Sequence, residues 1–236
     1  MSELKAVVQA GGLGTRLAPY STVLPKALMP IGDATVVDHL LTQFSNVGIK
    51  SVYITISKFG QLIRSYCGDG SRRGVQIGYV SESEPLGTIG PLNNLREELT
   101  GPFFVSNSDV FTDLPLGEVV AFNDARPAPV TVVVKRQRVD IDYGVLQHDS
   151  GKVRSFQEKP SRHFSVSTGI YLMQPDVFEF LPPSGPFGFD QLMRVMLDRK
   201  IPVNVYEHEG SWIDIGRIED LRRAQEHAAR ALVRSA

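Results

Sequence analysis

The sequence contains a single cysteine, Cys67, and no long run of apolar residues. One cysteine cannot form an intramolecular disulfide, and it cannot supply the paired thiolates of a structural zinc site. No stretch approaches the roughly 18 to 20 apolar residues that a membrane-spanning helix requires, and nothing at the N-terminus resembles a signal peptide. We therefore expect a cytoplasmic protein that neither spans nor enters a membrane.

The sequence also lacks an excess of either charge. It has 25 Lys and Arg against 26 Asp and Glu, for a formal net charge of -1. Proteins that bind by neutralising a phosphate backbone usually carry a clear basic excess, so polymeric nucleic acid is not an expected partner. What is present is an ordinary globular composition, with 42% apolar and 22% charged residues in 236.

Segments of strand and helix character alternate along the chain. Segments 5–10, 51–56, 75–80, 102–106 and 130–135 are predicted strands, and 35–44, 61–66, 88–99 and 116–123 are predicted helices, the first of them capped by Asp33. This order predicts crossovers over a mostly parallel sheet. From about residue 143, short strands joined by polar turns predict that the sheet becomes mixed. We expect one α/β domain over residues 1–236.

The sharpest local feature is the glycine-rich segment that follows the first predicted strand. Gly11, Gly12 and Gly14 leave backbone N–H groups free to surround an anion, and Arg16 can donate paired hydrogen bonds to it. The alternative is a glycine-rich connection with a surface arginine. The segment matches neither the dinucleotide fingerprint, which requires a small residue where Leu17 stands, nor the P-loop.

Other charged residues carry weaker signals. Lys26 stands in a loop between two prolines, which suits a cation aimed at a phosphate, although for this residue alone a solvated loop lysine is the favoured interpretation. Asp109 ends a predicted buried strand, where ligands bind in open α/β sheets, and a carboxylate there suits Mg²⁺ or caps a turn. Lys159 could belong to a surface ion pair with Glu158, and Asp214 follows Trp212, an ordinary core residue.

Taken together, these segments resemble the sugar-phosphate nucleotidylyltransferases, also called nucleotide-sugar pyrophosphorylases. The resemblance runs from residue 6 to about 225 and comprises AGGLGTRL, LPKALMPIG, EPLGTIGPL, NSDV, YGV, FQEKP, STGIYLM and WIDIGRIEDL in family order. It is strongest toward bacterial guanylyltransferases acting on mannose 1-phosphate or heptose 1-phosphate. It implies a single Rossmann-like three-layer α/β/α domain with a mostly parallel mixed sheet.

The resemblance also implies an activity and a set of residues. The enzyme would transfer a nucleoside monophosphate from a nucleoside triphosphate to a sugar 1-phosphate, with Mg²⁺ as cofactor and pyrophosphate as the leaving group. The implied catalytic residues are Arg16, Lys26 and Lys159. The implied nucleotide-binding residues are Ala10, Gly11, Gly12, Gly14, Thr15, Glu82, Gly87, Thr88 and Asp109. The implied sugar-binding residues are Tyr143, Gly144, Glu158, Lys159, Thr168 and Gly169, and the implied metal ligands are Asp109 and Asp214.

The identity of the base depends on Glu82, which stands where family members contact the Watson–Crick edge. A carboxylate only accepts hydrogen bonds, and guanine offers two donors on that edge, so GTP is favoured over uridine, thymidine, cytidine and adenosine triphosphates. Glu82 could equally belong to a solvated turn. Two positions depart from the family pattern. Gln9 stands where an aliphatic residue is usual, and Ser167-Thr168 stand where many members have Asn-Ala. The missing Asn removes a contact to a sugar hydroxyl, so the identity of the sugar stays open.

Two alternatives come from other classes of protein. A nucleotide-sugar-binding regulatory subunit without catalysis would be expected to have lost a phosphate lysine or a metal aspartate. An oxidoreductase of the Rossmann type is disfavoured by the broken glycine fingerprint. The chain shows no C-terminal hexapeptide repeats, so a catalytic domain without an appended regulatory domain is expected. The apolar stripe of the last helix either packs on the domain or forms a homodimer interface.

Overall fold

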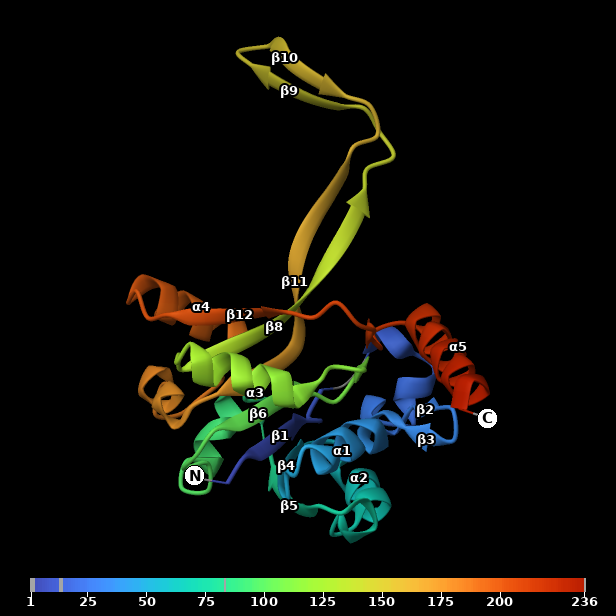
Figure 1. Ribbon diagram of the computed structural model, residues 1–236, viewed down its shortest axis with the longest axis vertical. Coiled ribbons are helices and arrows are strands. Elements are labelled where there is room, and N and C mark those ends of the chain that lie inside the picture. The colour runs from blue at the N-terminus through green and yellow to red at the C-terminus, as the bar shows by residue number, and fades with distance from the viewer. Residues whose placement is uncertain (1–2, 13–14, 83, 236) are drawn as a thin grey trace.

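A mostly parallel β-sheet forms the centre of the computed structural model, which describes residues 3–12, 15–82 and 84–235, and side chains up to residue 230 (Figure 1). Within those residues the main sheet has seven strands, in the order β12-β8-β11-β6-β1-β4-β5. Their bounds are β1 Lys5–Gln9, β4 Ser51–Ile56, β5 Gln76–Ser81, β6 Phe103–Asn107, β8 Val130–Asp140, β11 Ser161–Met173 and β12 Val203–Glu207. In this described sheet β11 alone runs against its neighbours.

Helical layers cover both faces of this sheet. One face packs against α1 (Val36–Asn46), α2 (Gly60–Cys67) and α3 (Leu116–Ala125), around fully buried residues such as Phe44 and Phe104. The other face packs against the 3₁₀ segments Gly90–Leu95 and Pro175–Phe180 and against α4 (Phe189–Asp198), around Phe103 and Leu192. Strands β1 and β6 are buried on both sides, as central parallel strands are. The predicted three-layer α/β/α fold with a mixed sheet is therefore confirmed.

A third apolar cluster joins the C-terminal helix to the segments that follow β1 and to β13 (Trp212–Asp214). Helix α5 (Ile218–Ser235) packs through Leu221, Ala224 and Ala228 on Leu17 and Ile213. Two small ladders frame this contact, β2 (Pro30–Ile31) with β3 (Ala34–Thr35), and β7 (Val110–Thr112) with β13. Among the described residues, we find no helix with the length and apolarity that crossing a membrane requires.

A long two-stranded arm projects from the body (Figure 1). Strands β8 and β11 pair from the core out to Asp140 and Ser161, with a bulge in β11 between Ser167 and Tyr171 where the register shifts. The tip is a separate hairpin of β9 (Val145–Asp149) and β10 (Lys152–Gln157). We call residues 136–165 the arm. Almost every residue of the arm is exposed, so the arm contributes little to the core.

Two details of the predicted elements are wrong. The segment 88–99 forms only a short 3₁₀ helix, Gly90–Leu95, because Gly90 and Pro91 disfavour a longer α-helix. The first helix is capped by Thr35 rather than Asp33: the Thr35 hydroxyl accepts from the Asp38 N–H, and the Asp38 carboxylate accepts from the Thr35 N–H. Neither change moves a strand end that carries a candidate site residue.

Candidate active site

A cavity of about 560 Å³ lies along the carboxyl ends of β6, β1, β4 and β5. We call it the strand-end cleft. The predicted nucleotide, catalytic and metal residues that line it are Gly11, Gly12, Lys26, Glu82, Gly87, Thr88 and Asp109. Parallel strands bring their carboxyl ends to one edge of a sheet, which is why residues far apart in the sequence meet here.

The glycine-rich segment lies against the Glu82 carboxylate. A Cβ atom at Gly11 would lie 2.6 Å from Glu82 Oε1, so a larger residue there would require the Glu82 side chain to move. The Ser57 hydroxyl donates to the Gly11 carbonyl at 2.7 Å and ties the end of β4 to the end of β1. Ala10 is buried beside them, and Thr15 begins an exposed 3₁₀ turn. Gly14 lies outside the described residues.

Lys26 and Asp109 form an ion pair inside the cleft. The Lys26 ammonium donates to Asp109 Oδ2 at 2.5 Å, and the two side chains are only 12% and 17% exposed. Buried Pro25 precedes Lys26, and the Lys26–Leu28 turn fixes the backbone from which the side chain reaches in. The lysine is therefore held on the carboxylate, and the interpretation of Lys26 as a freely solvated loop residue is wrong.

Asp214 is placed beside Asp109 by the β7–β13 ladder. Asp214 pairs in register with Val110, and the Ile215 N–H donates to the Asp109 carbonyl at 2.8 Å. Partial removal from water and the Asp109 charge raise the pKa of Asp214, whereas Lys26 and Arg16 lower it. The Asp214 carboxylate and the Arg16 guanidinium lie close to each other, since they are 3.7 and 3.8 Å from the position that a Cβ atom at Gly216 would occupy. Two carboxylates and two cations thus converge.

This arrangement suits a hard divalent cation. Mg²⁺ takes one or two carboxylates and completes its shell with water and phosphate oxygens. Asp109 lines the cleft, and the β7–β13 ladder places Asp214 beside it. Among the described residues, no cluster of three or more His, Cys, Asp or Glu side chains could hold a metal. By its chemistry, a pair of carboxylates fits a metal that takes its remaining ligands from water and a phosphate.

Hydrogen bonds that involve side chains help to hold the expected base-binding segment in place. The Leu86 N–H donates to Glu82 Oε2 at 3.2 Å, and the Phe189 N–H donates to the Thr88 hydroxyl at 2.9 Å. The Gln9 amide donates to the Thr88 carbonyl, which gives this unusual residue a physical role, since it ties the segment to the end of β1. Glu82 is thus oriented by the backbone, and its Oε1 atom lies toward Gly11.

Two of the predicted sugar residues lie at the base of the arm, beside the cleft. The Thr168 hydroxyl donates to the Val133 carbonyl at 2.9 Å, and the Trp212 indole donates to the Thr168 carbonyl at 3.0 Å. Gly169 has φ +78°, and a Cβ there would lie 2.5 Å from the side-chain nitrogen of Asn107, which lines the cleft. This bulge therefore fixes where the arm leaves the body.

The other predicted sugar residues lie on the arm itself. Tyr143 is 79% exposed, and Gly144, Glu158 and Lys159 are also exposed. Gly144 and Glu158 lie close together there, because a Cβ at Gly144 would lie 2.6 Å from the Phe156 ring and 3.2 Å from a Glu158 oxygen. None of the four lines the strand-end cleft as the structure describes it. The structure does not bring them together with Lys26 and Asp109.

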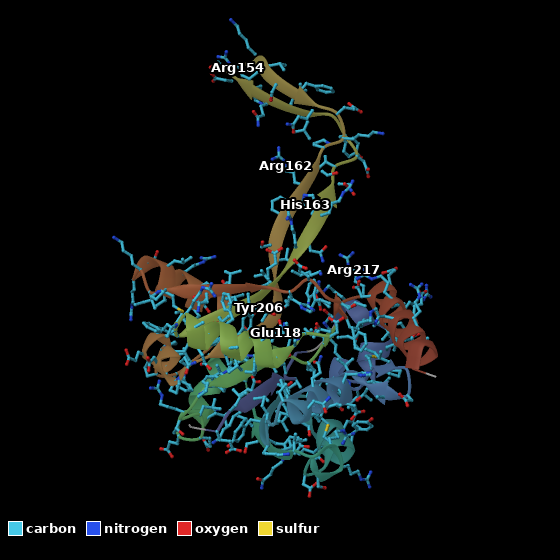
Figure 2. All side chains as sticks on the ribbon, in the orientation of Figure 1. Glu118, Arg154, Arg162, His163, Tyr206 and Arg217 are labelled. Atoms are coloured by element: carbon cyan, nitrogen blue, oxygen red, sulfur yellow. The ribbon has the colours of Figure 1, made fainter. Side chains whose placement is uncertain are left out.

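Figure 2 shows how far the arm side chains lie from the body. Arg154, Arg162 and His163 project from the arm, whereas Glu118 and Tyr206, joined by a 2.8 Å hydrogen bond, lie on the body.

Lys58 also lines the cleft and was missed by sequence reasoning. It stands two residues after β4, so the rule that led to Asp109, a charged residue just past a buried strand, could have found it.

The chain belongs to the nucleotidyl transferase family, whose model matches residues 5–231. A mannose-1-phosphate guanylyltransferase catalytic subunit beta from Danio rerio is 31% identical over 92% of this chain and 62% of its own length. A UTP–glucose-1-phosphate uridylyltransferase from Synechocystis is 31% identical over 94% and 62%. A Bacillus anthracis structure described as a candidate glucose-1-phosphate thymidylyltransferase, in complex with sucrose, is 25% identical, covers 95% of both chains and superimposes with a TM-score of 0.76. The chain spans about 62% of the curated relatives it matches.

Proposed function

We propose that this chain transfers a nucleoside monophosphate, from GTP in preference to other triphosphates, to a sugar 1-phosphate. The observation that carries the proposal is the convergence of Lys26, Asp109, Asp214 and Arg16 beside the glycine-rich segment. The names of the relatives support the reaction class, since they include guanylyl-, uridylyl- and thymidylyltransferases of sugar 1-phosphates.

The reaction needs positioning and charge neutralisation more than covalent help. An oxygen of the sugar 1-phosphate forms a bond to the α-phosphorus as the bond from that phosphorus to the bridging oxygen breaks, and pyrophosphate leaves with the electron pair. The nucleophile is already an anion, so no proton has to be removed. Backbone N–H groups of the Gly11–Gly12 segment and the Lys26 ammonium bind and orient the triphosphate.

Asp109 and Asp214 would hold the Mg²⁺ that neutralises charge on the phosphates when it is bound. Arg16 lies beside Asp214 on the same side, where it can donate to phosphate oxygens. In the described structure the Lys26 ammonium is bonded to Asp109, so Lys26 must exchange this partner for a phosphate oxygen when a nucleotide and metal enter.

The sugar side of the site involves the base of the arm and the arm itself. Gly169 packs on Asn107 at the cleft, which leaves the Thr168–Gly169 bulge beside the place where a sugar phosphate must approach the α-phosphate. Lys159 and Glu158 reach that substrate only if the arm folds toward the cleft or a second copy supplies them. A homodimer is therefore compatible with the proposal, and the sugar itself is left open.

The test is release of pyrophosphate by the purified chain, with a panel of nucleoside triphosphates crossed with a panel of sugar 1-phosphates and Mg²⁺. We expect release with GTP and at least one sugar 1-phosphate, and none without the sugar phosphate. If folded protein releases no pyrophosphate with any pair but still binds nucleotides or nucleotide sugars, the non-catalytic regulatory alternative replaces this one.

A further inference from the structure

The cleft crosses four neighbouring strand ends in one row. Gln9 pairs with Asn107 on one side and Thr55 on the other, and Ile56 pairs with Ser81. The segments that follow these strands line one cavity, from Asp109 through Gly11 and Ser57 to Glu82. Because paired strands lie about 4.8 Å apart, this row is roughly 14 Å long.

A nucleoside triphosphate fits this row in one direction. Its phosphates belong with Lys26 and Asp109, at the ends of β6 and β1, because the cation and the candidate metal ligands are there. The base then lies at the ends of β4 and β5. Two charged side chains on neighbouring segments, Lys58 after β4 and Glu82 after β5, line that end of the cavity.

These two side chains offer opposite hydrogen-bonding properties. The Glu82 carboxylate is oriented by the Leu86 N–H and only accepts. The exposed Lys58 ammonium lies 5.2 Å from the centroid of the Phe59 ring, which holds it by a cation–π contact, and it only donates. Among the described residues, no carboxylate oxygen forms an ion pair with Lys58. A ligand between the two would meet a donor on one side and an acceptor on the other.

We propose that Lys58 is a second base-reading residue, which donates to O6 and N7 of guanine while Glu82 accepts from N1–H and the 2-amino group. This inference rests on the proposed function, because it identifies the base of the triphosphate which that function requires. Guanine presents acceptors at O6 and N7, and lysine is a common partner for them. Adenine presents an amino donor in place of O6, and uracil turns a carbonyl toward the carboxylate.

The experiment compares Lys58→Met, Glu82→Gln and the unaltered chain with GTP, ATP and ITP, in the presence of the sugar 1-phosphate that the panel identifies. ITP keeps O6, N7 and N1–H but lacks the 2-amino group. The matched control is Lys50→Met, an exposed lysine at the opposite end of the same strand. Melting temperature verifies that each variant is folded.

Lys58→Met is expected to lower kcat/KM for GTP about 10-fold or more and to reduce the preference for GTP over ATP by at least that factor. The ratio of GTP to ITP should not change in Lys58→Met but should fall toward one in Glu82→Gln. Lys50→Met should change neither ratio. A loss in Lys58→Met that is equal for all triphosphates, or no loss at all, would overturn the proposal.

A nucleotide-binding measurement separates this inference from the proposed function. Displacement of fluorescent mant-GDP by GDP, IDP, ADP and UDP gives the corresponding preferences without any turnover. If the unaltered chain releases no pyrophosphate, the proposed function fails, whereas a loss of GDP preference in Lys58→Met still supports the assignment of Lys58. Displacement ratios that are identical in the two proteins, or an unaltered chain that prefers UDP, contradict it.

Discussion

The strand-end cleft and the arm hold their candidate residues in opposite ways. In the cleft, Lys26 and Asp109 are 12% and 17% exposed and bonded to each other. Asp109 stands two residues after buried β6, and Lys26 begins a short 3₁₀ turn. On the arm, Tyr143 is 79% exposed and Lys159 extends from an exposed hairpin. The cleft residues are therefore held in place by their neighbours, whereas under the proposed function the arm residues need a movement or a partner before they can act.

The largest expected effect is on the free energy of unfolding, and it compares a phenylalanine in the core below the cleft with a phenylalanine on the arm. Phe104 is 0% exposed, whereas Phe156 is 59% exposed on β10. Phe104→Ala should cost about 3–5 kcal/mol of unfolding free energy because it leaves a cavity, and Phe156→Ala should change it by less than about 0.5 kcal/mol. Urea unfolding measures both, and a large loss for Phe156→Ala would show that the arm is packed in solution.

The next effect separates a cleft carboxylate from an arm carboxylate. Asp109→Asn removes a charge that binds Lys26 and the candidate metal, and it should lower the rate of pyrophosphate release about 10²-fold or more. Asp149→Asn, which removes the partner of Arg154 at the tip of the arm, should leave that rate unchanged. Equal rates in the two variants would place the chemistry outside the cleft.

A smaller effect tests whether the arm reaches the substrate. Lys159→Met should lower kcat/KM for the sugar 1-phosphate about 10-fold or more, because a hydrogen bond to a charged group is lost, while the affinity for mant-GDP stays the same. Lys152→Met, an exposed lysine of β10, is the control. If Lys159→Met weakens GDP binding instead, then Lys159 serves the nucleotide and the division between the two regions is wrong.

The smallest effect concerns Asp214, the carboxylate beside Asp109 whose surroundings disfavour its ionised form. Because the pKa of Asp214 is raised by partial removal from water and by Asp109, its ionised form destabilises the fold at neutral pH. Asp214→Asn should therefore raise Tm by a few degrees at most while it lowers activity. A fall in Tm measured by calorimetry, with Asp142→Asn as the exposed control, would show that Asp214 has a structural role.

The same division explains what could be predicted from the sequence. Asp109 and the Gly11–Gly12 segment follow buried apolar strands, and parallel topology then places them at one edge whatever the loop details. Their grouping was therefore predictable, as was the three-layer fold, whereas the place of Lys26 beside them followed only from the family resemblance. Lys58 has the same position after β4 and was missed because a single lysine after a strand carries no motif.

The position of the arm residues was not predictable from local pattern. The sequence predicts a strand at 130–135, but β8 continues to Asp140 because it pairs with β11, more than 20 residues further on. Whether Lys159 lies in the cleft depends on how that hairpin leaves the sheet at the Thr168–Gly169 bulge. Such a long-range geometry is set by tertiary contacts with Trp212 and Asn107, which no local propensity encodes.

The most direct test of the account replaces the arm beyond its last paired residues and measures binding and transfer separately. Asp140 and Ser161 are paired, so a two-residue Asn-Gly turn in place of residues 141–160 closes the hairpin. The account predicts a folded protein that binds mant-GDP within about threefold of the unaltered chain and no longer releases pyrophosphate with GTP and sugar 1-phosphate. Loss of GDP binding, or full transfer without the arm, would contradict it.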